Sequence, residues 1–169
     1  MSEQGDNKEE APADDAQAAP DAGPQASEGS KVGSMKDGAY QVHILIETGK
    51  NMDLEGEDAV DPMIKVSFLA NSKSTTAKSG ITRTTQVKWD EHLFIDSPKL
   101  TEQEVSASMI EIEILNKGFF KSDSIGYFPI STPTIYMMNN HTLHNQMLAF
   151  TNPTADDKAK ISGYVMVSI

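Results

Sequence analysis

Alternation of apolar and polar side chains with a period of two residues is the feature that most restricts the fold of this chain. The clearest run is MIEIEIL, in which Ile110, Ile112 and Ile114 fall on one side and Glu111 and Glu113 on the other. A β-strand directs successive side chains to opposite faces, so such a run predicts a strand with one buried face. Further strand-like runs, separated by turn residues, occupy residues 40–47, 63–69, 89–96, 125–130, 145–150 and 161–169.

These runs predict an all-β fold, an antiparallel β-sandwich of about eight strands if residues 72–79 form one of them. Helical pattern is confined to two short segments. In residues 101–107, Thr101 is placed to cap a helix and Glu104 to close a capping box. Residues 132–140 are the second segment, with Pro133 at its start.

The composition changes near residue 37. Residues 1–36 are rich in Ala, Pro, Gly, Ser and acidic residues, and Val32 and Met35 are nearly their only large apolar side chains. Such a segment buries too little surface to offset its ordering entropy. We therefore predict a disordered acidic tail over residues 1–36, either an interaction arm or a solvating leader, and a folded domain over residues 37–169.

Several function classes are disfavoured by composition. The chain has no cysteine, which fits a reducing compartment, and no apolar run of the about 20 residues that a membrane span needs. A net charge of −11 argues against nucleic-acid binding. No nucleophile motif, P-loop or metal-ligand spacing of the four histidines is present, so we do not expect an enzyme.

Three motifs together resemble the C2 domain family. An acidic loop, GKNMDLEGED, leads to Asp61-Pro62 and directly into a strand; TQVKWDEHLFI carries Trp89, Glu91 and Phe94 at the matching places of a family strand; and DSIGYFPI resembles the segment after the third C2 loop. The resemblance covers nearly all of residues 40–169. It implies three binding loops gathered at one end of the sandwich.

A narrower resemblance is to the C2 domains of ferlins. HNQMLAFTNPTADDKAKISGYVMVSI is similar to their closing segment, with Met147 at a tryptophan position, and Asn116 resembles the ferlin form of loop three. Within the C2 resemblance, the order of the segments favours type II topology: the tail before residue 40 cannot supply a first strand, and residues 161–169 can take that place instead. It also implies a role in vesicle trafficking, membrane fusion or exocytosis, either as a fragment of a ferlin or as a short relative.

The family resemblance raises the question of calcium, which binds about six to eight oxygens. Loop three has Asn116, Lys117 and Gly118 where carboxylates are expected, and a lysine beside the metal position opposes binding. We therefore expect calcium binding to be weak or absent, and we expect no other cofactor. The remaining candidate ligands are Asp53, Glu55, Glu57, Asp58, Asp61 and Asp123.

The stretch NKGFFKSDS is the strongest candidate for a binding site. Phe119 and Phe120 follow a glycine and lie between Lys117 and Lys121, in a stretch with loop composition. We predict that both rings are exposed and enter a membrane, with Met52 and Leu54 of loop one at the same tip. The alternative is that one phenylalanine folds back to fill the base of the loop.

A second candidate surface is a run of basic residues without an intervening acid. In a C2 domain these positions can form a groove for phosphoinositide headgroups; the alternative is an ordinary solvated sheet face. The residues are Lys65, Lys73, Lys78, Arg83 and Lys88.

Two functions remain open. The first is a cytoplasmic module that binds an anionic phospholipid membrane peripherally, on vesicles or the plasma membrane, with little or no calcium dependence. The second is a protein–protein interaction domain that has lost calcium and lipid binding. The paired loop aromatics favour the first, and the net negative charge opposes it because it repels anionic lipid.

Overall fold

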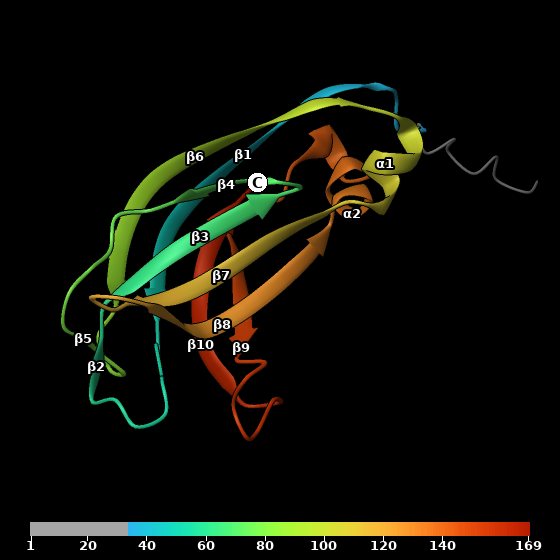
Figure 1. Ribbon diagram of the computed structural model, residues 1–169. Helices are drawn as coiled ribbons and strands as arrows, with labels where there is room; N and C mark the ends of the chain where they lie inside the picture. The colour runs from blue at the N-terminus through green and yellow to red at the C-terminus, as the bar shows by residue number, and fades with distance from the viewer. Residues whose placement is uncertain (1–33) are drawn as a thin grey trace, which may run out of the picture. The chain divides into compact units, whose positions relative to one another are not determined.

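The structure, a computed structural model, describes residues 34–169 (Figure 1). Its elements in chain order are β1 (Gly38–Lys50), β2 (Ala59–Val60), β3 (Pro62–Phe68), β4 (Asn71–Ser74), β5 (Ile81–Thr82), β6 (Val87–Leu100), α1 (Glu102–Ala107), β7 (Met109–Lys117), β8 (Ser122–Ser131), α2 (Thr132–Tyr136), a 3₁₀ turn η1 (Asn139–His141), β9 (Gln146–Thr151) and β10 (Ile161–Ser168).

The predicted eight-stranded antiparallel architecture is confirmed. The strand order is β4-β3-β7-β8-β9-β10-β1-β6, with β2 and β5 as a small separate pair. The long sheet folds over on itself, so that its two edge strands approach: the Asn71 side chain on β4 donates to the Asp96 carbonyl on β6 at 2.8 Å. The result is two layers with the core between them (Figure 1).

The alternating runs place their apolar side chains in this core. Ile112 and Ile114 on β7 are fully buried, whereas Glu111 is exposed on the opposite face. The same alternation holds in β3, where Ile64, Val66 and Phe68 are inside. Burying one such side chain is worth about 1.5–3 kcal/mol, so the hydrophobic pattern fixes which face of each strand points inward.

The helix expectations are confirmed at the start of each segment. α1 carries the capping box of Thr101 and Glu104. α2 has a proline in its first turn but ends at Tyr136, earlier than expected, and Asn140 adopts a left-handed φ of 55° that an α-helix cannot contain. Of residues 72–79, the part up to Ser74 forms a strand.

β10 pairs with β1 antiparallel from Leu45↔Ser168 to Lys50↔Tyr164, in the slot assigned to the last strand. The type II assignment itself stays a prediction. Among residues 34–169, no helix combines the length and the apolar character required to cross a bilayer.

The predicted tail needs one correction where the structure reaches it. Met35, assigned to the tail, is buried in the core cluster, and its sulfur accepts a contact from the Ser106 hydroxyl on α1 at 3.7 Å. The ordered domain therefore includes Met35. The rest of the tail prediction, residues 1–33, lies outside the described residues.

Candidate membrane-binding site

The loops expected to form the site gather at one end of the sandwich. Figure 1 shows the β1–β2, β7–β8 and β9–β10 connections at the end away from α1 and α2. Backbone hydrogen bonds join them: Lys117 donates to the Asp61 carbonyl at 2.9 Å, and Asp53 donates to the Ser162 carbonyl at 2.8 Å. These bonds connect loop one to the other two loops.

The β7–β8 hairpin presents Phe119 and Phe120 to solvent. Lys117 and Ser122 are the last register pair before the turn. The two side chains are 94% and 95% exposed, and their rings meet edge to face with centroids 4.7 Å apart. The prediction that both rings are exposed is therefore confirmed, and the alternative of a ring folded back into the loop is wrong.

Gly118 explains how the turn is made so tight. A Cβ atom at this position would lie 2.1 Å from the Lys121 carbonyl oxygen, closer than any side chain permits. Lys121 is itself exposed and lies 3.5 Å from the Asp123 carboxylate, a solvent-facing ion pair of little strength. The tip thus consists of two apolar rings between basic side chains.

The prediction that Met52 joins this tip is wrong. Met52 is 1% exposed and packs beneath loop one against Trp89. Gly49 and Gly163 make the space: a Cβ at Gly49 would lie 2.4 Å from the Met52 methyl, and one at Gly163 would lie 3.0 Å from its sulfur. Leu54, the other predicted contact, is partly buried and packs against the same core.

Asp53, a candidate metal ligand, is instead held by two cations. Its Oδ2 atom lies 2.9 Å from the Lys160 ammonium and 3.7 Å from the Arg83 guanidinium. That oxygen is buried and forms these ion pairs without a well-aligned hydrogen bond. Calcium at this carboxylate would face both cations, and the repulsion opposes binding.

The other candidate metal ligands are either hydrogen bonded within the protein or exposed to solvent. One Asp61 carboxylate oxygen accepts the Gly80 amide at 2.7 Å, while the Asp61 amide donates to the Asn116 side chain at 2.8 Å. Glu55, Asp58 and Asp123 are exposed. Within residues 34–169, no three His, Cys, Asp or Glu side chains are arranged to hold a metal ion.

The five basic residues do not form one groove. Lys65 lies opposite Ser74 and Val66 opposite Lys73, so Lys65 and Lys73 point to opposite faces of the sheet. Arg83 approaches Asp53, and Lys88 lies 2.5 Å from Asp90, which raises the pKa of Lys88 through their hydrogen bond. Lys78 contributes its backbone amide to the Pro62 carbonyl at 3.0 Å.

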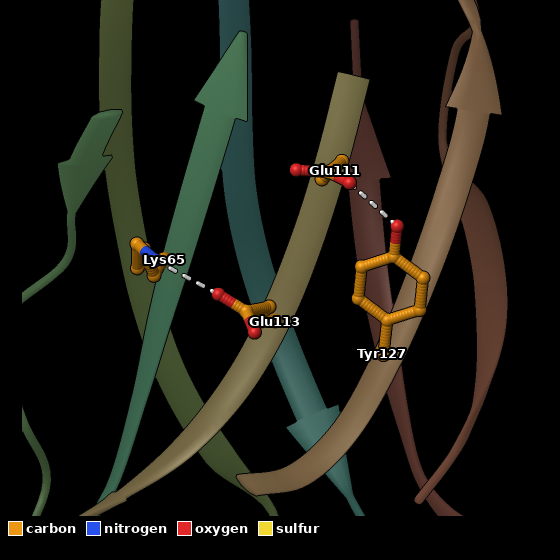
Figure 2. A network of polar contacts seen from close by, with 4 residues as sticks. All are labelled: Lys65, Glu111, Glu113 and Tyr127. Carbon is orange, nitrogen blue, oxygen red and sulfur yellow. Dashed lines mark hydrogen bonds and ion pairs between the residues drawn. The ribbon is translucent and has the colours of Figure 1, made fainter. Parts of the chain in front are cut away.

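The outer face of β3, β7 and β8 is instead a mixed polar network (Figure 2). The Lys65 ammonium lies 3.0 Å from Glu113, and the Tyr127 hydroxyl donates to Glu111 at 2.7 Å. The bond to the Glu111 carboxylate, with burial and the further charge of Glu113, raises the pKa of Tyr127 to about 12. The negative charges of Glu113, paired with Lys65, and of Glu111, bonded to Tyr127, oppose an anionic headgroup on this face.

Sequence reasoning missed Lys160. It lies on the β9–β10 connection, far along the chain from Asp53, and no local pattern links the two residues. The structural role of Asn116 was missed too: its side-chain oxygen accepts a hydrogen bond from the Asp61 amide, whereas the sequence suggested only that it replaces a metal ligand.

The fold and the loop arrangement are those of a C2 domain. The sequence model of the C2 domain family matches residues 40–149, more than half of the chain, and the chain therefore belongs to this family. C2 domains are modules that generally bind membranes or phospholipids. No curated protein matches the chain.

Solved structures share the fold at low sequence identity. The chain is similar to a structure of Extended-Synaptotagmin 2 that holds its SMP domain and two C2 domains, with a TM-score of 0.55 and 9% identity over 81% of this chain and 28% of that one. The structure of CC2D1B matches with a TM-score of 0.56 and 17% sequence identity, over 79% of this chain and 55% of that one. A C2 domain-containing protein from a putative elicitor-responsive gene matches with a TM-score of 0.54 and 14% sequence identity, over 80% of this chain and 91% of that one. The chain thus spans less than two thirds of the first two structures.

Proposed function

We propose that this C2 domain binds a phospholipid membrane peripherally by inserting Phe119 and Phe120 into the interface. The observation that carries the proposal is the near-complete exposure of both rings at a hairpin tip. Two adjacent aromatic side chains in water gain about 1.5–3 kcal/mol each when fully transferred to an apolar environment. A folded domain that exposes both at one point is prepared for such a transfer.

The basic side chains at the tip direct the insertion toward anionic lipid. Lys117 and Lys121 flank the rings, and each adds about 1 kcal/mol at an anionic surface. The net charge of −11 opposes this attraction, because it repels anionic lipid over distances up to about a Debye length. Insertion of the rings is therefore the main term, and anionic lipid adds to it.

The binding has little or no dependence on calcium. The Asp53 carboxylate already has the Lys160 and Arg83 cations beside it, and Asp61 is bonded to the Gly80 amide. These contacts connect loop one to the β9–β10 connection and to the residues on either side of β5 (Ile81–Thr82).

The cellular role is vesicle trafficking, membrane fusion or exocytosis at the cytoplasmic side of vesicles or the plasma membrane. This part of the proposal rests on the ferlin-like closing segment, in which Met147 and the loop TNPTADD precede the last strand. The alternative, a domain that binds a protein partner through its sheet faces, rests on the mixed polar face of β3, β7 and β8.

Sedimentation with liposomes tests the proposal. Vesicles of phosphatidylcholine, of phosphatidylcholine with phosphatidylserine, and of phosphatidylcholine with a phosphoinositide are each mixed with the protein in calcium or in a chelator. We expect binding to all three, strengthened by anionic lipid and equal with and without calcium. Absence of binding to every vesicle would reject the membrane function in favour of a protein partner.

A further inference from the structure

A cavity lies at the end of the sandwich opposite the loops, under α2 and η1. Its volume is about 230 Å3, and its lining includes Val42, Phe68, Ile110 and Ile135, all from the hydrophobic core. These residues come from β1, β3, β7 and α2. The cavity therefore has a floor of buried apolar side chains and a rim that is open to solvent, where Gln41, His43 and His141 are exposed.

The cavity lies where the start of β1 extends past its pairing with β10. The pairing of β10 with β1 reaches Leu45↔Ser168, and Ile169 then exchanges two 2.8 Å backbone hydrogen bonds with Leu143. The start of β1, residues 40–43, is thus left beside α2 and η1 in the described part of the chain.

The polar side chains at the rim are already hydrogen bonded within the protein. Gln41 donates to Asp96 at 2.7 Å, and the Nε2 atom of His43 lies 2.8 Å from Nδ1 of His92. Thr132 accepts from Ser108 at 2.8 Å. The same holds for the Tyr40 hydroxyl with the Lys36 carbonyl, for the His141 ring with the Tyr136 carbonyl, and for Thr142 with the Asn139 carbonyl.

This pattern restricts the chemistry of a ligand. No lysine, arginine, aspartate or glutamate side chain lines the cavity within the described residues, and its two histidines, His43 and His141, already contact His92 and the Tyr136 carbonyl. A charged ligand would therefore lose its hydration without a free ionic partner among these side chains. An uncharged apolar ligand has no such cost and contacts the Phe68, Ile110 and Ile135 side chains. An enclosed apolar cavity of about 150 Å3 takes up benzene; this cavity has a comparable apolar floor but is open on its rim side.

The rim next to the cavity is also conformationally unusual. Asn140 and His141 are consecutive residues with left-handed φ values of 55° and 56°. Such backbone costs on the order of 1–3 kcal/mol per residue and tends to occur at ligand-binding segments. The rings of Tyr136 and His141, which both line the cavity, stack with centroids 4.4 Å apart.

We propose that this cavity is a second binding site, independent of the membrane-binding tip, for a small uncharged aromatic or aliphatic molecule. The ligand is held by apolar contact, not by hydrogen bonds. Because toluene and indole are of suitable size and uncharged, they serve as probes. Their dissociation constants are expected on the order of 0.1–1 mM.

The test is a titration followed by isoleucine-methyl NMR of the full chain. With toluene or indole, saturable shifts are expected at the methyl groups of Ile110, Ile135 and Ile169, which line the cavity. The methyl groups of Ile114, near Gly163 at the loop end, should not move. Benzoate, of similar size but charged, is expected to bind at least tenfold more weakly.

Two variants that fill the cavity make the result decisive. Thr142→Trp and Ile169→Trp both change rim residues, and either is expected to abolish the shifts while the protein remains folded by its melting curve. Phe119→Ala/Phe120→Ala is the matched control, since it removes exposed aromatic surface elsewhere and should leave binding unchanged. Absence of saturable shifts, shifts spread over all isoleucines, or binding that survives both fillings would overturn the proposal.

Discussion

Replacing Phe119 and Phe120 together by alanine separates a membrane-inserting tip from a structural one. Both side chains are more than nine-tenths exposed, so the double variant removes almost no buried area. The interaction lost within the protein is the edge-to-face contact of the two rings, worth at most about 0.5–1.5 kcal/mol. We therefore expect a melting temperature close to that of the parent chain.

The loss of membrane affinity is expected to be much larger. Two partly inserted aromatic rings contribute on the order of 2–4 kcal/mol. At about 1.4 kcal/mol per tenfold change, this corresponds to a partition constant lower by roughly 30- to 1,000-fold. A titration of the protein with liposomes measures it, and thermal unfolding of the same sample measures the stability.

A matched control distinguishes insertion from a general loss of apolar surface. Phe94 is 48% exposed and lies on β6, stacked on His43 with ring centroids 4.3 Å apart, away from the tip. Phe94→Ala should bind liposomes as the parent chain does. If the double variant lost about 3–5 kcal/mol of stability per ring, as a buried phenylalanine would, or if its lipid affinity were unchanged, the reasoning would be refuted.

Four further predictions concern the rest of the domain. Calorimetric titration with calcium should give weak or no binding; a low micromolar constant with amide shifts at Asp61 would contradict this. Met52→Ala should cost about 2–5 kcal/mol in the free energy of unfolding, because it empties a packed site, yet leave lipid binding per folded molecule unchanged. Met35→Ala should also lower the unfolding free energy, whereas a solvated residue of a tail would give no change in chemical denaturation. Ultraviolet titration should show Tyr127 ionising near pH 12, because the bond to Glu111 raises its pKa above the unfolded value of about 10. The contribution of this bond to stability is therefore complete below pH 10 and is lost as the pH rises toward 12. Tyr127→Phe should remove this pH-dependent loss of stability.

Much of the fold could be predicted because its signals are local. The alternation in residues 109–115 is a property of neighbouring side chains, and burial of Ile110, Ile112 and Ile114 follows from it once any second layer exists. The α1 capping box is set by Thr101 and Glu104 alone. The turn before Phe119 likewise follows from Gly118 and the polar residues beyond.

The errors concern residues whose environment is made by distant segments. Met52 lies in a sequence that looks like an exposed loop, but its burial depends on Gly49, Gly163 and Trp89, which come together only in the folded chain. The basic run from Lys65 to Lys88 looks continuous in sequence. In the fold, strand alternation places Lys65 and Lys73 on opposite faces of the sheet. Lys65 is in addition paired with Glu113 of β7.

The sequence by itself determined the all-β class of the fold and the buried face of its alternating strands, since both follow from the alternation of neighbouring side chains. It favoured an exposed aromatic pair, but only the structure excluded a ring folded back into the loop. Only the tertiary structure decided that Asp53 is paired with Lys160 and Arg83, and that a cavity opens under α2. The physical reason is that charge pairing and packing act through space. Contacts between residues far apart along the chain leave no periodic pattern, and they become visible only when the strands that carry them are placed side by side.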